Sequence, residues 1–238
     1  MASFHYIFLS LLYVLVASHG INSGLTVETP LRPAGRHDVP FAIRAHWMHQ
    51  TTQALREQSS PCPFAAFGTA IVNHTGGNGL GDLICTGVND ISSTGNPTHH
   101  GEISAIDNCT QILQDPHGRF RLSPSETQAA FTDLTLYTNA ESCPMCAAAI
   151  RWAGFREYVY STSIDKLIEF GWGQINISSL EIFEHSRDLS SPYPRVIKDL
   201  LPAVTDPLFR WQFDDSMPCP LGCERVGDGS TCKIAVSF

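Results

Sequence analysis

Two short segments, well separated in the chain, constrain its fold more than any other feature. His100 and Glu102 form an H-x-E triplet, and Cys143 and Cys146 form a C-x-x-C quartet. Each segment lies at the predicted start of a helix, residues 101–113 and 143–153, and each helix follows a predicted strand, residues 83–88 and 134–138. If the two segments act together, the fold must bring the starts of two helices side by side.

The residue types in these segments are those of a zinc site. Cys143 and Cys146 are three residues apart, so their sulfur atoms face the same way on one helical turn. The positive end of a helix dipole favours the thiolate that a metal needs. With His100 as third ligand, one tetrahedral position stays open, which is typical of a catalytic rather than a structural zinc. Glu102 is close enough to move protons without binding the metal. One Zn2+ per chain is therefore the expected cofactor.

Each motif taken alone has an alternative interpretation. A C-x-x-C quartet also forms a disulfide or redox pair, and H-x-E triplets are common by chance. His99 is an adjacent rival ligand, and Glu102 is also suited to capping a helix. The order, the spacing and the two helix starts together favour zinc.

The remaining pattern predicts an α/β domain. A first helix is expected after Asp38, which would cap it, with Pro40 in its first turn and Phe41, Met48 and Leu55 on its inner face. Further strands are expected at 68–72 and 158–161, a capping box at 123–126 begins a short helix, and another helix covers 164–170. Helices alternating with strands indicate a mixed sheet covered by helices.

The N-terminus indicates the compartment. Residues 7–17 are apolar and uncharged, too short to span a bilayer, and have the length of a signal-peptide core. A buried N-terminal helix is the alternative. We expect secretion, or residence in the lumen of the secretory pathway, and no membrane contact after signal cleavage. Asn73 and Asn176 are then plausible glycosylation sites, whereas Asn108 lies inside a predicted helix.

Secretion also permits disulfides. Six of the eight cysteines remain once zinc takes two, and we expect two or three bridges among them. Six cysteines allow fifteen pairings, so the connectivity stays open, and a buried free thiol is an alternative for Cys109. The candidates are Cys62, Cys85, Cys109, Cys219, Cys223 and Cys232.

Charge argues against a nucleic-acid partner. The chain has 15 Lys and Arg against 23 Asp and Glu, a net charge of −8, whereas a nucleic-acid binder usually presents a basic face. A small-molecule partner is the better expectation.

The two motifs together match the H-x-E…P-C-x-x-C signature of zinc deaminases. The sequence resembles the cytidine and deoxycytidylate deaminase superfamily, and more narrowly its guanine deaminase and tRNA adenosine deaminase branch. The resemblance is carried by residues 96–106 (NPTHHGEISAI), 141–150 (ESCPMCAAAI) and 67–72 (FGTAIV). It implies a three-layer α/β/α cytidine-deaminase-like fold with a mixed central sheet.

The resemblance also implies roles for individual residues. His100, Cys143 and Cys146 match the zinc ligands, and Glu102 matches the proton shuttle. Two further positions match groups that contact the substrate. Asn89 corresponds to an Asn that hydrogen-bonds the base, and Trp152 to a Trp that walls a purine. A structural turn Asn and a core Trp are the alternatives at these two positions.

The sequence departs from the branch at three positions near the site. His99 and Gly101 stand where Ala is usual, and Ser142 stands where Pro is usual. None of these changes removes an atom that the reaction needs, so they bear on substrate geometry rather than on the chemistry.

The resemblance implies a zinc-dependent hydrolase of carbon–nitrogen bonds in cyclic amidines, which releases ammonia from a free nucleobase or nucleoside, most simply a guanine-type purine. Alternatives are a tRNA-type adenosine deaminase, a cytosine or cytidine deaminase, a structural zinc domain, and a secreted non-catalytic binding protein on a deaminase scaffold. A homodimer is left open. The expected division is a signal peptide at 1–20, a flexible mature N-terminus at 21–37, a zinc deaminase domain at 38–189 and a C-terminal extension containing Pro and Cys at 190–238.

Overall fold

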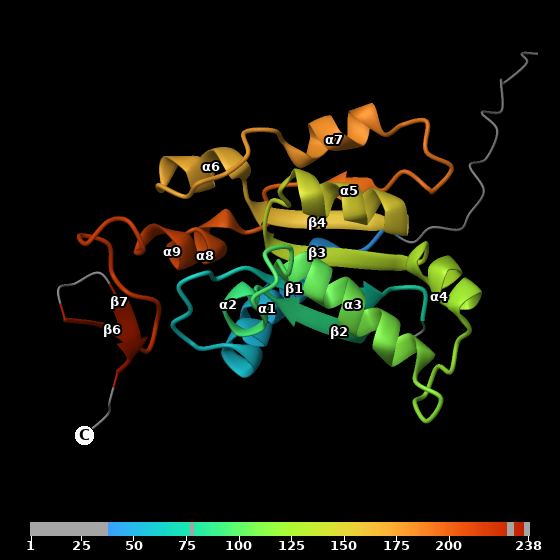
Figure 1. Cartoon of the computed structure of the whole chain (residues 1–238), viewed down its shortest axis with the longest axis horizontal. Helices are drawn as coiled ribbons and strands as arrows, with labels where there is room; N and C mark the ends of the chain where they lie inside the picture. The colour runs from blue at the N-terminus through green and yellow to red at the C-terminus, as the bar shows by residue number, and fades with distance from the viewer. Residues whose placement is uncertain (1–37, 77–78, 228–230, 236–238) are drawn as a thin grey trace, which may run out of the picture. The chain divides into compact units, whose positions relative to one another are not determined.

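The computed structural model describes residues 38–76, 79–227 and 231–235, and its centre is a five-stranded mixed sheet. The order across the sheet is β2-β1-β3-β4-β5 (Figure 1). The strands are β1 (Gly68–Asn73), β2 (Asp82–Val88), β3 (Leu134–Ala140), β4 (Glu157–Thr162) and β5 (Arg195–Ile197). Strand β1 is antiparallel to both β2 and β3, whereas β3, β4 and β5 are mutually parallel. The predicted mixed sheet is confirmed.

Helices cover both faces of this sheet. The described helices are α1 (Phe41–Gln58), α2 (Ile91–Thr94), α3 (Gly101–Gln114), α4 (Pro124–Phe131), α5 (Pro144–Ala153), α6 (Ile164–Glu169), α7 (Ser179–His185), α8 (Pro202–Thr205) and α9 (Pro207–Arg210). On one face, Ile71 and Leu136 pack against Ala105 of α3 and Ile150 of α5. On the other face, α1 packs against the sheet in a separate buried cluster. The result is the expected three-layer arrangement, with helices on both faces of a mixed sheet.

Strand alternation explains why both faces are apolar. Neighbouring side chains in a strand point to opposite faces, so Leu136 and Tyr137 of β3 enter different clusters. Every residue of β3 is buried, as expected for a strand covered on both sides. Burial on both faces fixes the register, because a slip by one residue would exchange the two sets of side chains.

The topology places the two motifs at one edge of the sheet. Since β1 is antiparallel to both of its neighbours, β2 and β3 run in the same direction and end at the same edge. Helix α3 begins after its N-cap residue His100, and α5 begins after its N-cap residue Cys143 with Pro144 at the first position. The helices that follow these two strands therefore start close together.

The start of α1 differs from the prediction. Its N-cap is Pro40, without a side-chain cap, so the expected Asp38 cap is wrong. Its buried face includes Trp47, Met48 and Leu55, but Phe41 is 65% exposed. The buried residues cluster toward the middle and end of the helix, where the helix lies over β1 and β3.

Several elements were not predicted. Helices α2 and α7 are short, and β5 has three residues. Strand β5 lies in the range 190–238 but joins the central sheet beside β4, and beyond it β6 (Cys223–Val226) and β7 (Thr231–Ile234) form a separate hairpin. The predicted segments 1–20 and 21–37 lie outside the described residues. In the part of the chain that is described, no helix combines the length and apolarity needed to cross a membrane.

Three disulfides pair all six cysteines outside the C-x-x-C motif. Cys85–Cys109 joins β2 to α3, and Cys219–Cys232 links β7 to the segment before β6. The third, Cys62–Cys223, joins the start of β6 to the loop before β1. The Cys219–Cys232 bond thus crosslinks the C-terminal region internally, and the Cys62–Cys223 bond ties it to the rest of the domain.

Candidate active site

The three predicted ligands come together. Atoms of His100, Cys143 and Cys146 that can bind a metal all lie within 4.8 Å of one another, and the Sγ atom of Cys143 is 3.5 Å from Nδ1 of His100. A tetrahedral zinc ion with bonds of about 2.3 Å to sulfur and about 2.0 Å to nitrogen holds its ligand atoms roughly 3.5–3.8 Å apart. One imidazole and two thiols at this spacing fit zinc.

The two thiols differ in their tendency to ionise. The hydrogen bond with Cys146, together with that of His100, lowers the pKa of Cys143 to about 4, although burial opposes this. Conversely, the hydrogen bond with Cys143 and burial raise the pKa of Cys146. The site therefore already favours a thiolate at Cys143, which is the form that binds a metal.

Glu102 lies beside this cluster in the first turn of α3. Its side chain is buried, and desolvation raises the pKa of its carboxyl group. A carboxyl group whose pKa is raised toward neutrality both accepts and donates protons effectively. Glu102 and the ligand residues His100 and Cys143 line the same cleft.

The cleft has a volume of about 670 Å3, which suits a small planar molecule. One side carries an aromatic wall, which we define as Phe64, Phe67 and Trp172. Asn89, predicted to contact a base, also lines the cleft, and its backbone N–H donates to the Phe67 carbonyl at 2.9 Å. The cleft therefore combines residues that can bind a metal, a buried carboxyl group and aromatic rings.

Trp152 has a different environment. It lies on α5 with 71% of its surface exposed, and it is not among the described residues that line the cleft. The structure therefore brings His100, Cys143, Cys146, Glu102 and Asn89 together and leaves Trp152 outside.

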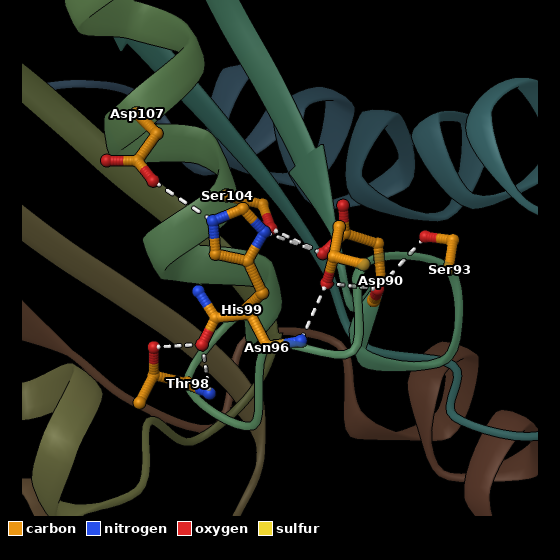
Figure 2. A network of polar contacts seen from close by, with 8 residues as sticks. Asp90, Ser93, Asn96, Thr98, His99, Ser104 and Asp107 are labelled. Atoms are coloured by element: carbon orange, nitrogen blue, oxygen red, sulfur yellow. Dashed lines mark hydrogen bonds and ion pairs between the residues drawn. The ribbon is translucent and has the colours of Figure 1, made fainter.

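His99, the rival ligand, has other partners. Its Nδ1 atom is 2.9 Å from Oδ1 of Asp90, and its Nε2 atom is 3.1 Å from Oδ2 of Asp107 (Figure 2). Ser104 also donates to Asp90, at 3.2 Å. Both ring nitrogens of His99 are thus engaged in holding the segment between β2 and α3 against α3.

The other two departures from the branch have packing explanations. A Cβ atom on Gly101 would lie 2.9 Å from the Phe67 carbonyl oxygen, so Ala does not fit here without a shift. The backbone N–H of Ser142 donates to the Tyr158 hydroxyl at 2.7 Å, and Pro has no N–H to donate.

Glu141 is a residue of the cleft that the sequence analysis missed. Its buried carboxylate accepts hydrogen bonds from the Ile164 N–H at 3.0 Å and from the Ser179 N–H and hydroxyl at 2.9 and 2.7 Å. It thereby joins the starts of α6 and α7, and the chain between those helices supplies Trp172 to the cleft. Its place directly before Ser142 and Cys143 was the available signal.

Comparison with known proteins agrees with this geometry. The family model described as the cytidine and deoxycytidylate deaminase zinc-binding region matches residues 43–162. A guanine deaminase from Bacillus subtilis is 29% identical over 130 residues, 55% of this chain and 70% of that protein. A probable cytosine deaminase from Schizosaccharomyces pombe is 27% identical over 112 residues, 47% of this chain and 59% of that protein.

Solved structures show the same fold. A mutant protein crystallised with 8-azaguanine gives a TM-score of 0.52 at 19% identity, covering 70% of this chain and 82% of that one. A guanine deaminase from Nitrosomonas europaea gives 0.50 at 18% identity, with the same coverage. With the family model spanning half of the sequence and both zinc motifs, the chain belongs to the cytidine and deoxycytidylate deaminase family.

Proposed function

We propose that this protein is a zinc-dependent hydrolytic deaminase that releases ammonia from a free nucleobase or nucleoside, with a guanine-type purine as its substrate. Its family membership makes it a hydrolase of carbon–nitrogen bonds in amidines. The observation that carries the proposal is that Glu102, His100 and Cys143 line one cleft, with Cys146 buried beside His100 and Cys143 within metal-binding distance.

The ligand residues and Glu102 divide the chemistry. His100, Cys143 and Cys146 would hold the ion, which supplies Lewis acidity and lowers the pKa of water. Glu102 accepts the proton of the attacking water and delivers protons to a ring nitrogen and to the leaving amine. The amine-bearing ring carbon gains an oxygen and loses ammonia, so water and substrate give the oxo base and ammonia.

Support for a guanine-type substrate comes from two sources. Relatives include guanine deaminases, and the cleft offers the Asn89 amide and aromatic rings suited to a purine. The net charge of −8 disfavours tRNA, whose phosphates require Lys and Arg. The cytosine deaminase relative keeps cytosine as the second candidate.

The deciding experiment measures zinc content and ammonia release with the purified full chain. Substrates are guanine, guanosine, adenine, adenosine, cytosine and cytidine, with a tRNA transcript as a further arm. We expect ammonia from guanine or guanosine, and none from a Glu102→Ala variant that retains its zinc. Turnover by that variant contradicts the role of Glu102. If the wild-type protein holds zinc and leaves all these substrates unchanged, it is a non-catalytic binding protein on this scaffold.

We also propose that the protein is secreted. Support comes from the apolar run at residues 7–17 and from three disulfides, which persist in oxidising compartments. When the chain is expressed in a eukaryotic secretory host, we expect the protein in the culture medium, with a new N-terminus near residue 21. Asn176 is exposed, and its replacement by Gln should remove one glycosidase-sensitive shift in mass. Retention of the protein inside the cell contradicts this proposal.

A further inference from the structure

Four aromatic side chains from three distant segments meet next to the cleft. Phe64 precedes β1, Trp172 follows α6, and Trp211 and Phe213 follow α9. The Phe64 ring centroid lies 5.7 Å from that of Trp172, 5.8 Å from that of Trp211 and 5.9 Å from that of Phe213. The rings of Trp172 and Phe213 are 5.2 Å apart. Each ring therefore supports its neighbours.

These rings form two layers with respect to the cleft. Phe64 and Trp172 belong to the aromatic wall that lines it, whereas Trp211 and Phe213 are not among the described lining residues. Hydrogen bonds connect the layers as well. The Trp172 indole N–H donates to the Phe209 carbonyl at 2.8 Å, and the Gln212 side-chain amide donates to the Phe64 carbonyl at 2.9 Å. The residues behind the wall thus hold the backbone of Phe64 and the side chain of Trp172.

All the supporting residues come from the C-terminal segment, defined here as residues 206–227 and 231–235. Its hairpin is joined to the residues behind the wall by Arg225, whose Nη2 atom donates to the carbonyls of Trp211, Asp214 and Met217 at 3.0, 2.8 and 2.7 Å. The hairpin is a separate two-stranded sheet, without pairing to the central sheet among the described residues. Its attachment to the domain consequently depends on side chains and on disulfides.

The Cys62–Cys223 disulfide is the covalent part of this attachment. It closes a sequence separation of 161 residues, and Cys62 is two residues from Phe64. Phe64 and Phe213 are each 51% exposed, so packing alone restrains them only on one side. A crosslink over a long loop strongly restricts the conformations that the joined segments can adopt.

We propose that the C-terminal segment is a buttress, fastened by Cys62–Cys223, that positions the aromatic wall against which a planar base stacks. The proposal rests on the proposed deaminase function for the identity of the ligand. Cys62, Cys223 and Phe213 are accordingly positioning residues for substrate binding, and their loss affects binding of the base more than the chemical step.

The primary test removes the crosslink from the full chain with the double substitution Cys62→Ser and Cys223→Ser. Cys85→Ala with Cys109→Ala is the matched control, because it removes a disulfide that does not reach the wall. We expect the first variant to raise KM for the base by about three- to tenfold, the effect of losing one aromatic contact, with kcat changed less than about twofold. Zinc content should stay that of the wild type. An equal rise of KM in both variants, or no rise in the first, overturns the buttress.

A second variant covers the case in which the serine variant does not fold. Phe213→Ala removes the ring behind Trp172 and keeps every disulfide, and Phe41→Ala is its control, since Phe41 is a comparably exposed phenylalanine on α1. KM should rise with Phe213→Ala and stay unchanged with Phe41→Ala. Unchanged KM in Phe213→Ala contradicts the proposal.

A measurement without substrate separates this proposal from the assignment of activity. Hydrogen exchange of backbone amides at residues 64–67 and 171–175 should accelerate in the Cys62→Ser and Cys223→Ser variant and not in the Cys85→Ala and Cys109→Ala variant. If exchange accelerates as expected and no base is deaminated, the buttress stands and the proposed function fails. If bases are deaminated and exchange is unchanged, the buttress fails alone.

Discussion

The Nδ1 atom of His99 lies 2.9 Å from the Oδ1 atom of Asp90, and this contact closes the segment that connects β2 to α3 (Figure 2). The other ring nitrogen reaches Asp107 in the second turn of α3. The segment that this imidazole holds, residues 90–99, lies between Asn89 and His100. The same imidazole therefore restrains a candidate base contact and a candidate zinc ligand. His99 stands where Ala is usual in the resembled branch, and we call its two contacts, with Asp90 and Asp107, the His99 clamp.

Replacing His99 with Ala should therefore lower kcat/KM about tenfold, because displacement of positioned groups by a fraction of an ångström is costly in an active site. Zinc content at saturating metal should remain that of the wild type, since neither nitrogen of His99 is used as a ligand. Steady-state kinetics and metal analysis check both statements. Ser93→Ala is the control, as its hydroxyl contacts only the Asp90 carbonyl among the described residues. Loss of zinc in the His99→Ala variant would contradict the clamp.

A second prediction concerns Gly101. Gly101→Ala should lower the free energy of unfolding by about 1–3 kcal/mol, because the new Cβ would lie 2.9 Å from the Phe67 carbonyl oxygen. Gly76→Ala is the matched control, since a Cβ there meets nothing within 4 Å. Denaturant unfolding of the zinc-loaded proteins provides the comparison. Equal stability of the two variants would show that the backbone at Phe67, just before β1, yields to the extra methyl group.

The Ser142 N–H bond to Tyr158 gives a third prediction. Ser142→Pro should destabilise the fold by about 1–3 kcal/mol, because it leaves the fully buried Tyr158 hydroxyl without its donor. Tyr158→Phe removes the same bond from the opposite side without restricting the backbone. In a double-mutant cycle, the losses in free energy of unfolding caused by the two substitutions should be strongly non-additive. Additive losses would mean that the hydrogen bond contributes little to stability.

A fourth prediction concerns stability in acid. Burial lowers the pKa of His74 from its usual 6.5, with Arg44 acting in the same direction and Glu157 opposing. The folded state therefore favours the neutral ring, whose Nε2 atom lies 2.9 Å from the Tyr137 hydroxyl. Because the folded pKa is depressed, this contribution is present above pH 6.5 and is lost as the pH falls through the folded value.

Unfolding measured between pH 7.5 and about pH 5 should thus show a steeper loss of stability for the wild type than for His74→Gln. His117→Gln is the control, since His117 is exposed in the loop after α3. A His74→Gln variant that follows the wild-type curve over this range would contradict the burial effect.

The fifth prediction compares two indoles. Trp172→Ala should raise KM for the base about tenfold, because Trp172 lines the cleft, and Trp152→Ala should leave KM unchanged, because Trp152 is 71% exposed on α5. Steady-state kinetics of both variants, with circular dichroism as a check on folding, provides the test. A raised KM for Trp152→Ala would contradict the placement of this indole outside the substrate site.

The central sheet and the metal cluster were predictable because their signals are local. Short runs of apolar, β-branched and aromatic residues mark β1 and β3, and the spacing of His100, Cys143 and Cys146 places three donors at two helix starts. The inner face of α3 was harder to predict from the sequence. Its most hydrophobic residues, Ile103, Ile106 and Ile112, are only partly buried, whereas Ala105, Cys109 and Leu113 are buried.

Close packing explains that difference. A Cβ on Gly87 would lie 2.2 Å from the Ala105 nitrogen, so α3 approaches β2 too closely for large side chains at this contact. Hydrophobicity alone does not reveal such proximity, because it depends on which glycine faces which helix.

The aromatic wall was missed for another reason. Phe64 and Trp172 of the wall, and Phe213 behind it, come from three irregular segments. No periodicity relates residues that meet only in the folded chain. The one available sign was the clustering of cysteines at 219, 223 and 232, which indicated an anchored terminus without indicating where it is anchored.

The position of Cys223 near the end of the chain has a consequence for biosynthesis. All ligands and Glu102 precede it in the sequence, so a ribosome has completed the whole metal cluster before the partner of Cys62 is made. A growing or truncated chain that ends before residue 223 has the groups for proton transfer and lacks the covalent link behind its aromatic wall. On the buttress proposed above, full affinity for a base is gained only after residue 223 has been synthesised.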